Sequence, residues 1–260
     1  MSERNDYNHA RVADNSITAR DRTHFRGRNR MESRFRSYLA EFVGTFALIF
    51  VGSLAAAVAF ESRAGVNSAG IVLGALAHGF ILMVMIYALG SISGCHINPA
   101  VTIALAFLRK ISITDAVLYI TFQLGGAIVG SLLHAAVRAQ GDTNLGLPGV
   151  SPSIGDGSGF LLEAITTFFL VIVIIGTVVS GKGPAGFHGL AIGMTLGASW
   201  LIAGSLTGAA LNPARHFGPA VVTGDYGSIW VYWAGPIAGA LVAAAIGWFL
   251  FLKDSEIDRL

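Results

Sequence analysis

Long runs of apolar residues, broken only by short polar segments, fill most of the chain from residue 38 onward. Six of these runs have roughly the 20 residues that a helix needs to cross the apolar core of a bilayer. They predict spanning helices at Tyr38–Phe60, Gly70–Ser91, Thr114–Ala136, Phe160–Ser180, Phe187–Ser205 and Ile229–Leu252. The pattern therefore predicts an all-α membrane protein.

Two further apolar runs, Asn98–Phe107 and Asn212–Val222, are too short to cross. A helix rises about 1.5 Å per residue, so about ten residues reach only halfway through the bilayer. The two runs are therefore expected to form either surface helices or re-entrant half-helices.

The two halves of the chain repeat each other, which indicates an internal duplication. Each half carries a glutamate in its first span and an Asn-Pro-Ala tripeptide at the start of its short run. These residues are Glu41 with Asn98, Pro99 and Ala100, and Glu163 with Asn212, Pro213 and Ala214. Each half has three spans, an odd number, so the halves are expected to lie in opposite orientations. Inverted repeats of this kind place their site near the bilayer midplane.

The domain organisation follows from these runs. Residues 1–36 contain nine arginines and no apolar run, which predicts a disordered basic cytoplasmic tail. An alternative is a tail that lies on anionic lipid. Residues 37–252 form the predicted channel domain, with repeats at 37–137 and 159–252, and residues 253–260 form a C-terminal cytoplasmic tail.

The basic residues of the short loops predict the orientation. Arg109, Lys110 and Lys182 fall on the side of the N-terminal arginines, and the loops on the other side are poorer in basic residues. Under the positive-inside rule both termini are cytoplasmic. The plasma membrane is the expected location. The loop around residues 141–157 is rich in Gly, Pro, Ser and Asp and is interpreted as a plain extracellular connector.

Composition supports the membrane assignment. Of the 260 residues, 53% are hydrophobic and 12% are charged, where a soluble domain has about 25% charged residues. Mean hydropathy is +0.65. The net charge of +2 does not favour nucleic acid as a partner, and the single cysteine, Cys95, excludes an intrachain disulfide.

The paired Asn-Pro-Ala tripeptides predict how the site works. Asparagine is a good N-cap and proline suits the first helical turn, so each tripeptide starts a half-helix. Two half-helices that meet at their N-termini place their positive dipole ends at the centre of the bilayer. That potential opposes cations, while the amides of Asn98 and Asn212 offer donors to a neutral solute. Donors without a nucleophile favour conduction over catalysis, so neither an enzyme nor a cofactor is expected.

The sequence resembles the aquaporin family over about residues 38–252. The matching residues are Glu41 and Glu163, Ser93 through Thr102, Gln123 with Gly126 and Ala127, Asn212 through Ala220, and Tyr232 through Pro236. The resemblance implies an hourglass of six spanning helices and two half-helices, a homotetramer with one pore per subunit, and uncharged substrates. It also implies that Glu41, Glu163, His96 and Gln123 support the re-entrant loops.

The family has a second constriction, and the resemblance places it at His78, Trp200, Ala209 and Arg215. Water-selective members usually carry Phe on the second helix and His on the fifth, and glycerol-conducting members carry Trp on the second and a small residue on the fifth. Here His78 and Trp200 look exchanged. His216 stands where glycerol-type members have Asp, and Ala220, Tyr232 and Trp233 look water-type.

These features favour a passive channel for water that excludes protons and ions. Ammonia, glycerol or metalloid acids remain as alternative solutes, and a secondary transporter using Glu41 and Glu163 is a remote alternative. Two further hypotheses concern single residues. Cys95 is a candidate mercury site facing the pore, and titration of His78 or His216 is a candidate cause of pH dependence.

Overall fold

The structure is a computed structural model that describes residues 19–60, 68–138 and 144–253. The described residues form helices and connecting loops, without a strand. The chain divides into two compact units, Met1–Ser37 and Tyr38–Leu260. The predicted tail residues 1–18 and 254–260 lie outside the described residues.

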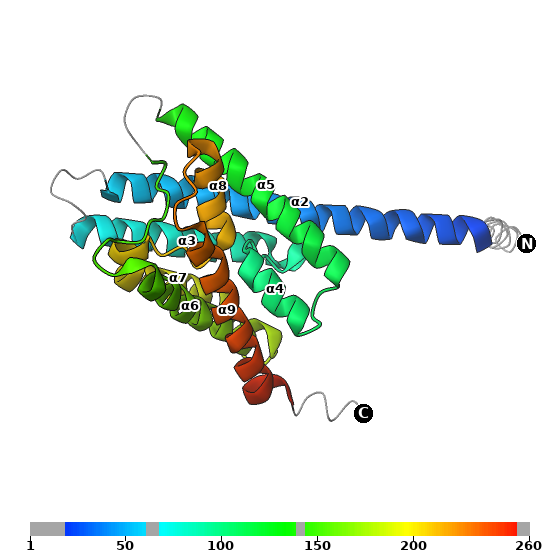
Figure 1. Ribbon diagram of the computed structural model, residues 1–260. Helices are drawn as coiled ribbons and strands as arrows, with labels where there is room; N and C mark the ends of the chain where they lie inside the picture. The colour runs from blue at the N-terminus through cyan, green and yellow to red at the C-terminus, as the bar shows by residue number, and fades with distance from the viewer. Residues whose placement is uncertain (1–18, 61–67, 139–143, 254–260) are drawn as a thin grey trace, which may run out of the picture. The chain divides into compact units, whose positions relative to one another are not determined.

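The predicted spans are helices in the structure (Figure 1). Within the described residues, six helical stretches are long and apolar enough to cross a membrane. They belong to α2 (Ala19–Phe60), α3 (Ser68–Ser93), α5 (Ile113–Val137), α6 (Gly155–Ile174) with the π-helical turn η1 (Ile175–Val179), α7 (His188–Thr207), and α9 (Ile229–Gly247) with the π-helical turn η2 (Trp248–Leu252). The all-α membrane fold predicted from the apolar runs is therefore confirmed.

The first helix begins earlier than its apolar run. α2 starts at Ala19, inside the segment predicted to be a disordered tail. Arginine is a good helix former. Glu32 also stands four residues before Arg36, a spacing that stabilises a helix. The apolar run therefore marks the part of α2 that can cross a membrane and not the start of the helix.

The two short runs form half-helices whose N-termini meet. α4 (Pro99–Phe107) and α8 (Pro213–Thr223) each begin with proline behind an asparagine cap. Each cap residue also bonds to the loop before the other half-helix, as described below. The alternative of surface helices is therefore wrong, and both short helices are re-entrant.

Glycines let the long helices approach closely in both halves of the chain. A methyl group added at Gly130 of α5 would lie 3.0 Å from the carbonyl oxygen of Phe46 in α2. One added at Gly235 of α9 would lie 3.0 Å from that of Phe160 in α6. Close backbone contact between small residues is how helices associate in membranes. α3 also packs on α7, and α4 on both α5 and α9.

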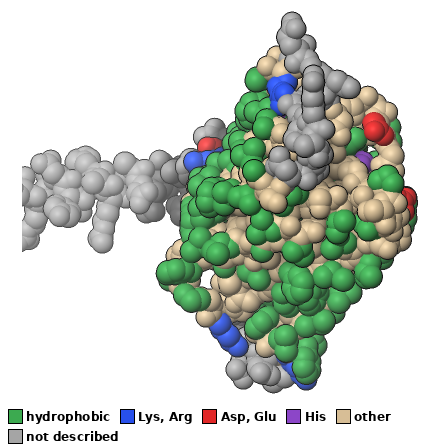
Figure 2. Space-filling model, turned by 90° about the vertical axis from the view of Figure 1, so that its left-hand side faces the viewer, with side chains coloured by type: hydrophobic (Ala, Val, Ile, Leu, Met, Phe, Trp, Pro, Cys, Tyr) green, Lys and Arg blue, Asp and Glu red, His purple; other side chains and the backbone are tan. Residues whose placement is uncertain are grey.

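Apolar side chains cover much of the surface. Figure 2 shows hydrophobic side chains across the middle of one face, with Lys and Arg at its upper and lower margins. Large apolar residues are exposed on several spans, among them Phe80, Val117, Met194 and Val242. Exposed apolar surface of this extent is unfavourable in water. The apolar core of a bilayer provides a suitable environment for it.

Candidate functional site

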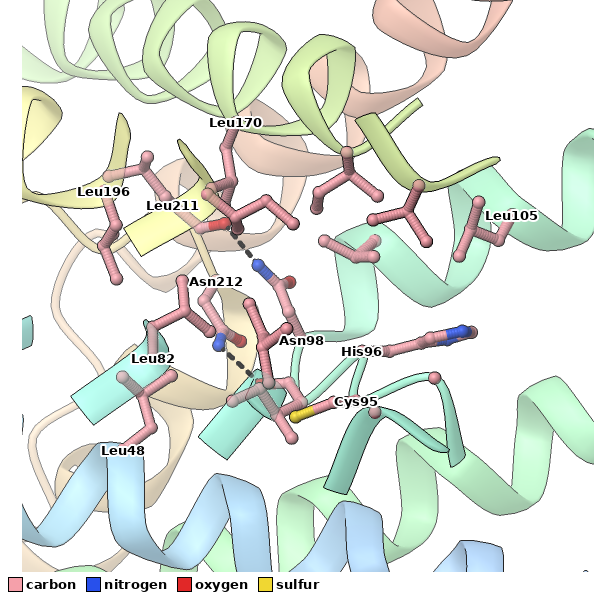
Figure 3. Close-up of a pocket in the computed structure, with 18 of the residues that line it drawn as sticks. Leu48, Leu82, Cys95, His96, Asn98, Leu105, Leu170, Leu196, Leu211 and Asn212 are labelled. Carbon is pink, nitrogen blue, oxygen red and sulfur yellow. Dashed lines mark hydrogen bonds between the residues drawn. The ribbon is translucent and has the colours of Figure 1, made fainter. Parts of the chain in front are cut away.

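The two asparagine caps hold the half-helices together. Asn98 accepts the N–H of Ala100 and Asn212 accepts the N–H of Ala214, each at 2.9 Å. The amide nitrogen of Asn98 donates to the carbonyl of Leu211, and that of Asn212 donates to the carbonyl of Ile97, also at 2.9 Å. Figure 3 shows both of these bonds, each from an asparagine amide to a backbone carbonyl. Each amide carries two N–H groups, so one remains for a molecule in the pore.

Glu41 braces the loop that precedes α4. One carboxylate oxygen accepts the hydroxyl of Ser93 at 2.6 Å and the N–H of His96 at 2.9 Å. The other accepts the N–H of Ile97 at 2.6 Å and the side-chain amide of Gln123 at 2.7 Å. Glu41 is fully buried, and these four donors compensate for its desolvation. Its carboxylate is thereby held by two backbone N–H groups and two side chains, and Glu41 does not line the cavity described below.

Glu163 makes the equivalent contacts with the loop that precedes α8. It accepts the hydroxyl of Thr207 at 2.7 Å, the N–H of Ala210 at 3.0 Å and the N–H of Leu211 at 2.7 Å. Glu163 is also fully buried. The contacts of both glutamates fit the role that the resemblance implies for them, which stays a prediction.

The braced loops have an unusual backbone. Cys95, Ile97, Ala209 and Leu211 have φ angles of 52°, 40°, 44° and 52°. Such left-handed conformations cost of order 1–3 kcal/mol at non-glycine residues and persist only where the surroundings impose them. The two carboxylates provide such surroundings, because they bind the N–H groups of these loops.

A cavity of about 170 Å³ runs past both asparagines. Its walls are mainly apolar and include Leu48, Leu82, Leu170 and Leu196, while its polar lining includes Asn98 and Asn212 (Figure 3). Gly94, Cys95 and His96 line it as well. One water takes up at least about 10–15 Å³ of such space, so the cavity has room for a short file of waters. The apolar walls leave only a few polar groups for these waters to bind.

Arg215 and His78 lie together at one end of this cavity. The Arg215 Nε–H donates to Nε2 of His78 at 3.1 Å, and Nη2 donates to the carbonyl of Gly146 at 2.7 Å. Because an arginine only donates, Nε2 of His78 is the acceptor. Its Nδ1 then donates to the carbonyl of Gly74 at 2.8 Å. His78 is therefore neutral, and the single positive charge here is that of Arg215.

Both side chains are buried, with 2% of His78 and 1% of Arg215 exposed. The Nη1 atom of Arg215 has no hydrogen-bond partner within the part of the chain that the structure describes. A buried guanidinium with an unused donor is costly unless it meets water or a solute. Because Arg215 lines the cavity, its guanidinium supplies the positive charge at this end.

The other two predicted constriction residues are placed differently. Trp200 is fully buried and stacks on His78, with ring centroids 5.0 Å apart, yet it does not line the cavity. Ala209 is fully buried and does not line it either. The structure thus brings His78, Trp200 and Arg215 together in one contact group. The roles of all four residues in selectivity stay predictions.

The remaining predicted residues divide between the cavity and the packing around it. Cys95 lines the cavity although only 5% of it is exposed. His96 also lines it, and its ring faces away from the two asparagines toward Thr102, 3.1 Å from Nδ1 (Figure 3). Gln123 bonds Glu41 and Thr102. His216 stacks on Tyr232 at 4.4 Å, outside the cavity lining.

The loop interpreted as a plain connector contributes to the site, so that interpretation is wrong. Gly146 supplies the carbonyl that binds Arg215, and its neighbours Leu145 and Leu147 are buried. The loop is also held by the bond from the N–H of Ser151 to the carbonyl of Leu206, at 2.7 Å. The two leucines in a segment rich in Gly and Pro were the available signal, because exposed connectors rarely need them.

The arrangement can bind small neutral molecules and oppose cations. The amides of Asn98 and Asn212 offer hydrogen-bond donors to such a molecule. Arg215 and the N-termini of α4 and α8 are positive. The described residues contain no group of three or more His, Cys, Asp or Glu that could hold a metal ion.

Comparisons with known proteins agree with this geometry. Residues 29–247 match the family model "Major intrinsic protein". The chain is 39% identical over 222 residues to "Probable aquaporin TIP2-2" of Oryza sativa, covering 84% of this chain and 88% of that protein. It is 42% identical over 214 residues to "Glycerol uptake facilitator protein-like 6" of Lactiplantibacillus plantarum, covering 80% and 95%. The X-ray structure of the aquaglyceroporin from Plasmodium falciparum aligns with a TM-score of 0.71 at 25% identity, covering 87% of this chain and 100% of that one.

Proposed function

Because the chain belongs to the major intrinsic protein family, whose members are passive membrane channels and not enzymes, we propose that it conducts water and excludes protons and ions. The observation that carries water as the solute is the bond between Arg215 and His78. It joins two buried side chains across one end of the cavity. A passage narrowed by these two side chains suits a molecule the size of water.

Exclusion of cations is supported by the charges along the path. Arg215 lies at one end, and the N-termini of α4 and α8 meet near the two asparagines. Each helix N-terminus carries roughly half a positive charge. The carboxylates of Glu41 and Glu163 are absent from the cavity lining. A cation on this path would meet positive potential without a counter-charge on the wall.

Exclusion of protons is supported by the donors at the centre. A water beside Asn98 and Asn212 would accept an N–H from each amide through its oxygen. Its own hydrogens would then point away toward its two neighbours in the file. A water held in this way cannot accept a proton from one neighbour while it donates to the other.

The second candidate is a channel for other small neutral solutes such as glycerol, ammonia or metalloid acids. Two observations favour it. One relative is named a glycerol uptake facilitator and a structural neighbour is an aquaglyceroporin. In addition, Trp200 lies outside the cavity lining, so its bulk does not narrow the path.

Stopped-flow light scattering on proteoliposomes tests the solute. Fast osmotic water efflux with a low activation energy and negligible glycerol entry is the expected result. Glycerol entry at a comparable rate would overturn water selectivity. Flux that stays the same when ion gradients are collapsed is also expected, and loss of flux would instead point to a secondary transporter.

We further propose a homotetramer in the plasma membrane with both termini in the cytoplasm. Orientation is supported by Arg109 and Lys110, which lie between α4 and α5, and by Lys182, which lies between η1 and α7. Positive residues in short loops favour the cytoplasmic side. Protease access to each terminus in sealed vesicles tests the orientation. Light scattering of the purified protein tests the tetramer.

A further inference from the structure

Trp200 occupies a slot made by two glycines, one on each of two helices. A methyl group added at Gly204 of α7 would lie 2.6 Å from Cε3 of the Trp200 indole. One added at Gly74 of α3 would lie 2.7 Å from the same atom and closer still to Cζ3 and Cη2. Atoms at such distances overlap, so a side chain at either position would displace the indole. The glycines are therefore what allows a tryptophan at this position.

The slot is connected to the constriction through His78. The indole stacks on the His78 ring at 5.0 Å, with 27° between the planes. On α2, a methyl group added at Gly52 would lie 2.6 Å from Nε2 of His78, the atom that accepts from Arg215. The His78 ring therefore has Trp200 on one side and α2 on another. A displaced indole has little room to move without moving the histidine.

Resting on the proposed function, we infer that Gly74 and Gly204 are positioning residues for the constriction. They hold the Trp200 indole beside His78 and out of the water path. The largest residue of the predicted constriction thereby supports its wall without narrowing it. Without the slot, the indole would press His78 toward Arg215 and close the path. The pore width thus depends on two residues that do not line the cavity.

The test is water permeability of proteoliposomes that contain the Gly74→Ala variant. We expect permeability to fall about fivefold or more, because a pore of one water's width is sensitive to small displacements of its wall. The double variant Gly74→Ala with Trp200→Phe should recover most of the flux, because phenylalanine lacks the outer ring that the new methyl group meets. Wild-type flux in Gly74→Ala, or no recovery in the double variant, would overturn the inference.

Gly79→Ala is the matched control. Its methyl group would lie 2.7 Å from the backbone carbonyl of Gly193, in the same contact between α3 and α7 but away from the indole. A loss of flux in Gly79→Ala should not be recovered by Trp200→Phe. Recovery there would mean that the tryptophan substitution simply loosens the helix pair. Thermal unfolding and gel filtration of each variant identify those that fail to fold.

A fluorescence measurement separates this inference from the proposed function. If liposomes with the wild-type protein lose water no faster than empty liposomes, the proposed water conduction is wrong. The position of the Trp200 indole is then tested without a flux measurement. In a background of Trp230→Phe, Trp233→Phe and Trp248→Phe, the fully buried Trp200 should resist quenching by acrylamide. Gly74→Ala in that background should make it quenchable. Equal quenching with and without the alanine would overturn the inference.

A different region carries a second inference, a pocket of about 570 Å³ between the end of α4 and the end of α9 with η2. Arg109 and Lys110 line it together with the apolar Phe107, Leu108, Ala245 and Trp248. Arg109 and Lys110 are both exposed. Nearby on the same helical end, the Lys253 ammonium lies 5.3 Å from the Phe249 ring centroid.

We propose that this pocket binds the phosphate headgroup of an anionic phospholipid. It lies at a membrane end, because α5 begins to span at Ile113 and the last span ends at Leu252. Basic residues at this depth attract anionic headgroups, and tryptophan favours the interface between headgroups and acyl chains. Arg109 and Lys110 would hold the phosphate, while Phe107 and Trp248 contact the first part of an acyl chain.

Quenching of Trp248 by brominated lipids tests this site. The emission of Trp248 is the part of the fluorescence that the Trp248→Phe variant lacks. Brominated phosphatidylglycerol should quench this emission at about a tenfold lower mole fraction than brominated phosphatidylcholine does. The Arg109→Ala, Lys110→Ala double variant should lose that difference. Lys182→Ala, a basic residue outside the pocket, should keep it. Equal quenching by both lipids in the wild type, or an unchanged difference in the double variant, would overturn the proposal.

Discussion

Counted from its motif asparagine, each half of the chain contributes corresponding positions to opposite ends of the cavity. One end has His78, Trp200, Ala209 and Arg215. The corresponding residues of the other end are Ile192, Ile86, Cys95 and Val101. The second set lines the cavity completely, whereas only His78 and Arg215 of the first set do so. The same backbone plan thus yields an apolar end lined by all four residues and a polar end lined by two.

This difference shows that selectivity does not need the symmetry of the fold. The braced loops, the asparagine caps and the glycine contacts occur in both halves, so they serve the architecture. Arg215 and its acceptor His78 occur once. A single arginine with a neutral histidine as its acceptor is enough to give a symmetric pore one selective end, and the apolar end then only has to let water pass.

The largest effect is expected from Val101→Arg, which gives the apolar end a charge without the partners that Arg215 has. Ile192 replaces the acceptor that His78 provides at the polar end. An unpaired arginine at membrane depth costs at least about 2.5–3.5 kcal/mol, and its side chain fills the path. Water permeability should fall at least about tenfold. The matched variant Val101→Ile should keep most of the flux, and wild-type flux in the arginine variant would contradict the comparison.

Arg215→Val makes both ends apolar and is the converse change. Removing the guanidinium widens the polar end and abolishes its positive charge. Glycerol permeability should rise about tenfold while water permeability changes less than about threefold. Flux of water and glycerol should be compared in the same liposome preparation. Unchanged exclusion of glycerol would show that Arg215 does not set the aperture.

Mercury distinguishes the two ends through one pair of residues. Cys95 lines the cavity and its counterpart Ala209 does not. A mercurial should therefore slow wild-type water flux about threefold or more, and Cys95→Ala should be insensitive. Adding Ala209→Cys to that variant should not restore sensitivity. Wild-type flux that ignores mercury would show that the Cys95 thiol is off the path.

The smallest effect is expected from pH. His78 can take a proton only on Nε2, the atom that accepts from Arg215, and protonation would place two positive charges side by side. His216 is stacked on Tyr232 outside the cavity. Water permeability should therefore vary by less than about 20% between pH 5 and 8. A clear step in this range would show that the bond between His78 and Arg215 opens.

The sequence predicted the parts of the fold that depend on chemical type along the chain. The six spans follow from the lengths of the apolar runs, and the two half-helices follow from the paired Asn-Pro-Ala motifs. Asn98 and Asn212 are helix caps as their motif implies. Helix ends were less accurate. α6 begins at Gly155, five residues before the predicted Phe160, because Asp156 and the glycines around it are tolerated in its first turn.

Features that depend on packing could not be predicted in this way. The position of Trp200 requires glycines at 74 and 204 to face the same ring, and sequence does not show which residues of two helices meet. The bond from Arg215 to Gly146 joins residues far apart through a backbone carbonyl, a group that every residue has. Charge and hydropathy therefore locate the site, but its aperture depends on contacts that only the folded chain defines.

The paired asparagine bonds also bear on how the chain is synthesised. They join Asn98 to Leu211 and Asn212 to Ile97, residues separated by more than a hundred positions. While the first half is being made, the cap of α4 has its own loop and the Glu41 brace but no acceptor from the second half. The centre of the pore is therefore completed only after α8 has entered the membrane. Insertion of α8 completes both asparagine bonds. In a nascent chain that stops before α8, the first half lacks these bonds.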